Sequence, residues 1–259
     1  DARRQANKTT QLNEQVSIAI DEVMEMRPTF GVRRITAFIN QQHCLFNLPR
    51  INHKRVERIM KERNLLFPEA SGSGKARDHD GQVSTPRPNM RWCSDGFEIR
   101  CQNREIVTAG VIMDCCDREI ISYSARQGRG LTDGMVQDAL ILAFDRRCTE
   151  LDLANQPLQF LSDNGAAYIS KETQKVEALL GITDCKTPVR SPQSNGMAES
   201  LVRTLKRDYF GCMDIPDAKT ALRILPEVIA KYNETHPHSA LKYLSPREFR
   251  RQWFEAEGG

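Results

Sequence analysis

The sequence contains no apolar run approaching the ~20 residues that a membrane-spanning helix needs, and it starts with polar and charged residues. We therefore expect neither a membrane span nor a signal peptide. The Gly74-Lys75 pair lacks the glycine spacing and the following Ser or Thr of a phosphate-binding loop, so nucleotide hydrolysis is not expected.

Paired CxxC motifs are also missing, although the chain has eight cysteines. His43, Cys44 and His53 lie close in sequence but lack the two-plus-two spacing of a zinc site. We interpret the cysteines as reduced thiols that pack as small apolar side chains in a cytoplasmic protein. Neither a zinc site nor a disulfide framework is predicted.

Charge is unevenly distributed along the 259 residues, whose net charge is only +3. Residues 27–63 carry nine Lys and Arg against two acidic residues, whereas residues 69–259 carry 25 basic and 27 acidic residues. A basic N-terminal module attached to a nearly neutral body indicates a polyanion-binding domain joined to a second domain.

Apolar periodicity predicts three N-terminal helices, over residues 10–26, 32–43 and 52–64, with Thr10 and Asn52 as N-caps. Three short helices with a basic third one are typical of a helix-turn-helix-like module. Its candidate DNA contacts are Arg33, Arg34, Lys54, Arg55 and Arg58. The alternative is a helical spacer with a solvated basic face.

Residues 69–89 are rich in Pro, Gly, Ser and charge, and are predicted to be a flexible linker. The predicted domains are therefore a helical DNA-binding module over 1–68, the linker, and a catalytic core with a C-terminal helical extension over 90–259. Within this core, alternation and apolar runs predict strands over 91–100, 104–114, 119–126, 158–163 and 182–187. Helices are predicted over 132–148, with Thr132 as N-cap, and over 171–180, 194–211, 217–233 and 246–256.

Three acidic residues fall at informative places in this order. Asp95 lies mid-strand on the same side as Cys93 and Phe97, where a carboxylate is costly unless it is paired or binds a metal. Asp163 follows an apolar strand and precedes an Asn-Gly turn, and Glu199 lies in the first turns of a helix. Carboxylate oxygens are hard ligands that suit Mg²⁺ or Mn²⁺.

With 35 residues between Asp163 and Glu199, this pattern resembles the DDE triad of the retroviral-integrase superfamily. More narrowly, the chain resembles the OrfB transposases of insertion-sequence family three, closest to the IS-two branch. The segments that carry the resemblance are residues 30–35, 91–96, 162–165, 191–199 and 236–241.

The resemblance implies an α/β fold, an RNase H-like catalytic core in which strands one and four lie side by side. It implies a DNA transposase that cleaves and joins insertion-sequence ends by a copy-out-paste-in route, with two Mg²⁺ or Mn²⁺ ions per site. Asp95 would bridge both ions, and Asp163 and Glu199 would each bind one. The implied partners are transposon-end and target DNA and further copies of the chain, two or more, in the bacterial cytoplasm.

The Glu199 helix offers additional DNA contacts, because Asn195, Arg203 and Lys206 share a face with the acid. Arg190, on the preceding loop, is a weaker candidate. The alternative for these residues is surface salt bridging. Asp114 and Asp117 are interpreted as solvated turn residues, and Glu98 as lying on the wrong face of its strand.

Two further residues, His236 and His238, flank a proline and so cannot lie on a regular helix. We interpret them as a structural or DNA-contacting turn, rather than as a metal pair. Two other functions remain open for the chain: a catalytically inactive DNA-binding protein on the same scaffold, and an RNase H-type nuclease that cuts without joining.

Overall fold

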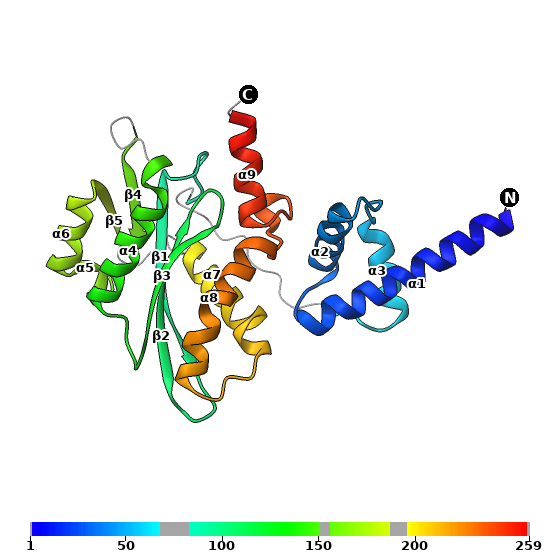
Figure 1. The fold of residues 1–259 in the computed structure, drawn as a ribbon, viewed down its shortest axis with the longest axis horizontal. Helices are drawn as coiled ribbons and strands as arrows, with labels where there is room; N and C mark the ends of the chain where they lie inside the picture. Colours follow the sequence, from blue (N-terminus) through cyan, green and yellow to red (C-terminus); the bar gives the residue numbers. More distant parts are fainter. Residues whose placement is uncertain (1, 68–82, 151–155, 187–195, 258–259) are drawn as a thin grey trace, which may run out of the picture. The chain divides into compact units, whose positions relative to one another are not determined.

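The computed structural model describes residues 2–67, 83–150, 156–186 and 196–257 (Figure 1). The chain divides into two compact units. One contains Asp1–Arg77 and Thr235–Ser245, and the other contains Asp78–Glu234 and Pro246–Gly259. A short segment from late in the sequence therefore belongs to the N-terminal unit. The linker predicted over 69–89 lies mostly outside the described residues.

The N-terminal unit is built from α1 (Ala2–Met26), α2 (Val32–Leu45) and α3 (His53–Glu62). Apolar side chains from all three helices, among them Ile20, Ile35 and Met60, form one buried core. The predicted cap of α3 is confirmed, because the Asn52 side chain accepts a hydrogen bond from the Lys54 N–H at 3.0 Å. The prediction that Thr10 caps α1 is wrong. The helix begins at Ala2, since most of residues 2–9 are good helix formers and none is Gly or Pro.

The late segment of this unit carries the two histidines. The ring of His236 is buried and packs edge-on against Phe30, with 5.6 Å between the ring centroids, and His238 lies 5.0 Å from His236. A short 3-10 turn, η4 (Ser239–Leu241), follows. The segments 30–35 and 236–241, which both carried the family resemblance, are thus packed together through Phe30 and His236. His236 therefore has a structural role.

The second unit contains one five-stranded sheet in the order β3-β2-β1-β4-β5. Its strands are β1 (Arg91–Arg100), β2 (Ile106–Asp114), β3 (Ile120–Gln127), β4 (Leu158–Ser162) and β5 (Ile182–Lys186). The first three form an antiparallel meander, while β4 runs parallel to β1 and β5 runs parallel to β4. The expected neighbourhood of strands one and four is confirmed.

Helices cover both faces of this sheet (Figure 1). One face carries α4 (Asp133–Arg147), α5 (Ala166–Ile169) and α6 (Lys171–Leu179). The other face carries α7 (Gly196–Asp208) and α8 (Ala218–Thr235). The short helix α5 was not predicted from the sequence. Side chains of β1 alternate between the two cores, with Trp92 in the first and Cys93 in the second. The predicted cap of α4 is confirmed by a 3.4 Å hydrogen bond from the Met135 N–H to the Thr132 hydroxyl.

A buried ionic cluster lies where β2 turns into β3, and it corrects the interpretation of Asp114 and Asp117 as solvated. Both side chains are fully buried. Asp114 accepts hydrogen bonds from the N–H groups of Asn89 and Cys116, at 2.6 and 2.7 Å. Arg147, also buried, lies 3.6 Å from Asp117 and donates to Glu119 at 2.7 Å. The sequence showed that Asp114 and Asp117 flank a turn, but it did not show that Arg147 packs against them.

The final helix, α9 (Pro246–Glu257), completes this cluster. Arg247 of α9 donates to Glu119 at 3.0 Å, and Arg250 lies 3.7 Å from Asp117 and also pairs with Glu150. Burial and the negative charge of Asp114 raise the pKa of Asp117 well above its ordinary value. The arginines therefore stabilise a group of carboxylates that would otherwise be strongly unfavourable to bury.

Candidate active site

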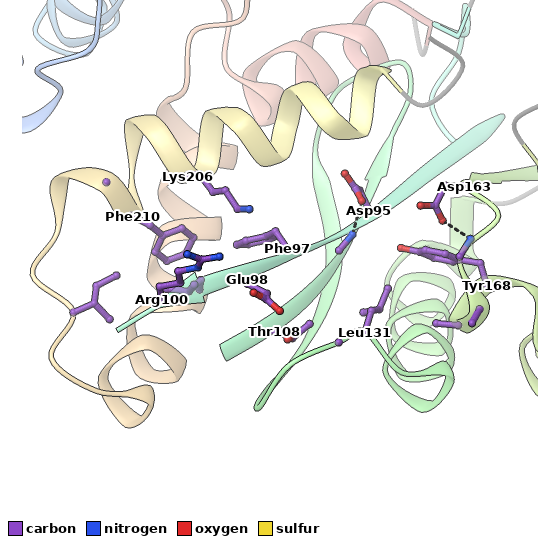
Figure 2. Close-up of a pocket in the computed structure, with 18 residues that line it drawn as sticks. Asp95, Phe97, Glu98, Arg100, Thr108, Leu131, Asp163, Tyr168, Lys206 and Phe210 are labelled. Atoms are coloured by element: carbon purple, nitrogen blue, oxygen red, sulfur yellow. Dashed lines mark hydrogen bonds between the residues drawn. The ribbon is translucent and has the colours of Figure 1, made fainter. Parts of the chain in front are cut away.

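The site lies along an open edge of β1. Strand β4 pairs with β1 only from Arg91 to Cys93, so that from Ser94 onward no strand among the described residues lies beside this edge. Residues 95–100 of the open edge line a hollow of about 770 Å³. Figure 2 shows the carboxylates of Asp95 and Asp163 at one end of it.

Asp95 is held on the open edge in a partly buried position. One carboxylate oxygen accepts a hydrogen bond from the Gly96 N–H at 2.7 Å. Burial, together with the negative charges of Asp163 and Glu199, raises the pKa of Asp95 to about 6, while the Gly96 N–H and Lys206 act in the opposite direction. Asp163 and Glu199, from separate parts of the chain, therefore both lie near enough to Asp95 to disfavour its ionised form.

Asp163 directly follows β4 and is exposed to solvent. Its carboxylate is turned back toward α5 by a hydrogen bond from the Gly165 N–H at 2.8 Å (Figure 2). A Cβ atom at Gly165 would lie only 2.9 Å from that carboxylate oxygen. A side chain at this position would have to push the carboxylate aside, so the glycine leaves room for the orientation that the hydrogen bond gives the acid.

Glu199 lies in the first turn of α7 and is exposed. The buried residues around it, among them Ala198 and Val202, belong to the core on the side of β1 that also holds Cys93. This packing places Glu199 beside Asp95, and the two acids line a second, shallower hollow together with Lys206. Asp95 thus lies between two hollows, one shared with Asp163 and the other with Glu199.

The donor chemistry of the three acids fits a hard divalent cation, because all of their ligand atoms are carboxylate oxygens. Among the described residues, however, no group of three His, Cys, Asp or Glu side chains is close enough to enclose one ion. The two observations are compatible, since charges influence a pKa over distances longer than a metal–oxygen bond. The acids are neighbours but do not form a closed shell around one ion.

Basic residues accompany the acids on α7. Arg203 and Lys206 are exposed and line the second hollow, and Lys206 also lines the first. The neighbouring Arg207 pairs with Asp208 at 2.8 Å, so salt bridging involves this arginine. The other two predicted contacts, Arg190 and Asn195, lie outside the described residues.

In the N-terminal unit, the predicted DNA contacts lie on two helices. Arg33 and Arg34 begin α2, and Arg34 lies over the Phe30 ring with 5.5 Å to its centroid. The remaining three lie on α3: Lys54, Arg55 and Arg58. Of these, Lys54 and Arg58 are exposed.

Several residues that shape the site were not singled out from the sequence. The Tyr168 hydroxyl is buried and hydrogen-bonded to Ser94 at 2.9 Å, and burial raises the pKa of this tyrosine. Leu131 packs against the cross-strand pair of Gly96 and Gly110, where added Cβ atoms would approach it to 3.1 and 2.8 Å. Glycines in an otherwise apolar strand were the available signal, because they mark a close approach.

A mixed sheet of this order, with acids on β1, after β4 and on α7, defines an integrase-type catalytic core. Family models described as "Integrase core domain" match residues 85–192 and 180–246, and an "HTH-like domain" model matches residues 11–68. The transposase InsD for insertion element IS2A/D/F/H/I/K of Escherichia coli is 44% identical over 240 residues, which cover 92% of this chain and 78% of that protein. The chain therefore belongs to the IS2 family of insertion-element transposases, within the DDE transposases of insertion-sequence family three.

A second relative, the InsD transposase for insertion element IS2-9 of Escherichia coli K12, is also 44% identical and aligns with 92% of this chain and 77% of its own. Among solved structures, a chain of the simian T-cell lymphotropic virus intasome matches with a TM-score of 0.52 at 17% identity, covering 81% of this chain and 73% of that one. This likeness supports the fold. The predictions of family, fold class and transposase function are confirmed. No helix among the described residues is long and apolar enough to cross a membrane.

Proposed function

We propose that this transposase cleaves and joins DNA at the ends of an insertion element, with Asp95, Asp163 and Glu199 holding two divalent ions. The observation that carries the assignment is the position of Asp95 between two hollows, with one further acid in each. The raised pKa of Asp95 supports it, because it reports unfavourable burial and negative charge that bound cations would relieve.

Each acid has a distinct part in this proposal. Asp95, on the central strand, bridges the two positions, and the Gly96 N–H fixes one of its oxygens. Asp163 serves the hollow along the β1 edge, in the orientation set by Gly165. Glu199 serves the other hollow from α7. When bound, Mg²⁺ or Mn²⁺ activates the attacking water or 3′-hydroxyl and stabilises the leaving 3′-oxygen.

The protein itself supplies no nucleophile in this scheme. Tyr168 lines the hollow, but its hydroxyl is not suited to act as a nucleophile. It is buried and hydrogen-bonded to Ser94, and burial raises the pKa of the phenol. Arg203 and Lys206, exposed on α7, hold backbone phosphates of the reacting strand beside the acids. Arg190 and Asn195 are proposed to assist them from the segment before α7.

The rest of the proposal concerns how the protein binds transposon ends and assembles on them. The N-terminal helices bind DNA near the transposon end through Arg33, Arg34, Lys54, Arg55 and Arg58, because residues 27–63 carry nine basic and two acidic residues while the rest of the chain is slightly acidic. Domain boundaries at 1–68, 69–89 and 90–259 remain our assignment. We place the protein in the bacterial cytoplasm, acting by copy-out-paste-in transfer in a complex that contains two or more copies of the chain and pairs both ends.

The test is a strand-transfer assay with a labelled end duplex and Mg²⁺. Wild-type protein should yield joined product, and Asp163→Asn should abolish joining while retaining DNA binding. Glu172→Gln, which removes an exposed carboxylate from α6, is the matched control and should remain active. Cutting without joining would favour the nuclease alternative, and binding without any reaction would favour an inactive DNA-binding protein.

A further inference from the structure

The hollow along β1 continues well beyond the acids. It runs from Asp95 to Arg100, the last residue of the strand, whose side chain is exposed. Figure 2 shows Lys206 extending from α7 above Phe97, and Arg100 next to Phe210 at the end of the hollow away from Asp95. Both line it, so the hollow has a cation at a distance from the acids as well as one beside them.

The charges of this hollow favour an anionic occupant away from Asp95 and Asp163. Neither Arg100 nor Lys206 has an acidic partner within ion-pair distance in the part of the chain that the structure describes. The one acid among the lining residues of the far half is Glu98, two positions before Arg100. Arg100 makes no ion pair with the described residues and lies at the end of a hollow that leads to the acids. It can therefore bind a phosphate of the DNA backbone.

The spacing decides which phosphate Arg100 reaches. Arg100 lies five positions after Asp95 on an extended strand, which is roughly 17 Å at ~3.3 Å per residue. Successive phosphates of one DNA strand rise by only ~3.4 Å along the helix axis. Arg100 therefore lies too far away to contact the phosphate that reacts at Asp95, and it is suited to one several nucleotides away on the same strand.

The wall of the hollow near the two cations is apolar. Phe97 and Phe210 pack with 5.9 Å between their ring centroids, and Ile215 lines the hollow beside them. An apolar wall with cations beside it matches a nucleic-acid strand, in which sugars and bases alternate with charged phosphates. Such a strand would follow the open edge of β1, where no other strand of the described residues pairs.

We propose that Arg100 is a positioning residue of the transposase that binds a backbone phosphate several nucleotides from the reacting one, and that the hollow along β1 is the channel for that strand. The proposal rests on the function proposed above, since it assumes that DNA reacts at Asp95. Arg100 does not touch the reacting atoms. It fixes the register of the strand that passes them.

The experiment measures binding of a labelled end duplex across a salt series, using the full-length protein in Ca²⁺ or EDTA so that no reaction occurs. Removing one phosphate contact should reduce the slope of log K against log salt by about 0.7–0.9. Arg100→Gln should show this reduction, and Arg100→Lys should restore the slope. Arg223→Gln, which removes an exposed arginine from α8, is the matched control and should leave the slope unchanged.

Two further arms separate a phosphate contact from a structural role. Glu98→Gln should strengthen binding, because it removes the negative charge from the same half of the hollow. A single neutral methylphosphonate placed several nucleotides from the reacting phosphate should weaken wild-type binding, yet have little additional effect on Arg100→Gln. An unchanged slope in Arg100→Gln, or equal sensitivity of both proteins at every methylphosphonate position, would overturn the proposal.

Failure of this proposal is distinguishable from failure of the proposed function. If wild-type protein joins ends in Mg²⁺ and only the Arg100 results are negative, the catalytic assignment stands and the channel does not. If wild-type protein joins no ends while Arg100→Gln still lowers the salt slope, the hollow binds DNA and the catalytic assignment fails.

Discussion

Replacing Asp95 by Asn should stabilise the metal-free protein at neutral pH while destroying its activity. In the wild-type protein, burial and the charges of Asp163 and Glu199 disfavour the ionised carboxylate. Asn keeps the shape and the oxygen that accepts from the Gly96 N–H at 2.7 Å. The substitution therefore removes an unfavourable charge without removing the local hydrogen bond, which is the usual trade between stability and function at an active site.

The magnitude follows from the pKa of Asp95, which is raised from 3.8 to about 6. At ~1.36 kcal/mol for each pH unit, the difference corresponds to at most ~3 kcal/mol. Because the side chain is only partly buried, solvent screening reduces this value, and we expect a gain of about 1–2 kcal/mol in the free energy of unfolding at pH 7.5.

The gain should depend on pH in a defined direction. A carboxyl group whose pKa is raised in the folded state contributes stability below its unfolded pKa and loses that contribution as pH rises through its folded pKa. Wild-type protein loses this contribution between about pH 4 and pH 6, whereas Asp95→Asn has nothing to lose there. The difference in stability should thus be small at pH 4.5 and level off above about pH 7.

Urea denaturation of both proteins in EDTA, from pH 4.5 to 7.5, measures the effect. Glu98→Gln, which removes one negative charge from the same strand and hollow, controls for a general effect of net charge. Adding Mg²⁺ should stabilise wild-type protein more than Asp95→Asn, because only the wild-type protein keeps the bridging carboxylate. A destabilised Asp95→Asn protein at pH 7.5, or a gain of equal size at every pH, would refute the reasoning.

Three other predictions concern stability, orientation and DNA binding. Arg147→Met should lower the free energy of unfolding by about 3–5 kcal/mol, measured by urea denaturation, because it leaves buried carboxylates without their cation; a loss below ~1 kcal/mol would contradict the cluster's role. Gly165→Ala should abolish strand transfer with little change in melting temperature, since its Cβ would displace the adjacent catalytic carboxylate, while Gly134→Ala, with nothing within 4 Å of the new Cβ, should stay active; an active Gly165→Ala protein would show that this orientation is unimportant. Arg55→Gln combined with Arg58→Gln should lower the salt slope of end binding by about two, as measured by fluorescence anisotropy; an unchanged slope would remove α3 from the DNA contacts.

Local features of the chain could be predicted because their causes are local. Asn52 and Thr132 cap their helices through backbone N–H groups only two or three residues away. Alternation along β1 placed Asp95 on the same side as Cys93, and that side is covered by the helix that carries Glu199. Sequence motifs in family order then indicated the integrase-type fold, which the comparisons confirm.

What the sequence by itself determined is which residues form each strand and helix, and which acids are suited to metal chemistry. Only the tertiary structure decided which partners meet across long sequence separations. Asp117 is buried because Arg147 and Arg250 reach it from two other helices, which no turn motif reveals. Likewise, Arg100 is an ordinary strand-end arginine until the short pairing between β1 and β4 leaves the edge beside it open. Local propensity acts over a few residues, whereas burial and charge compensation depend on how distant segments pack.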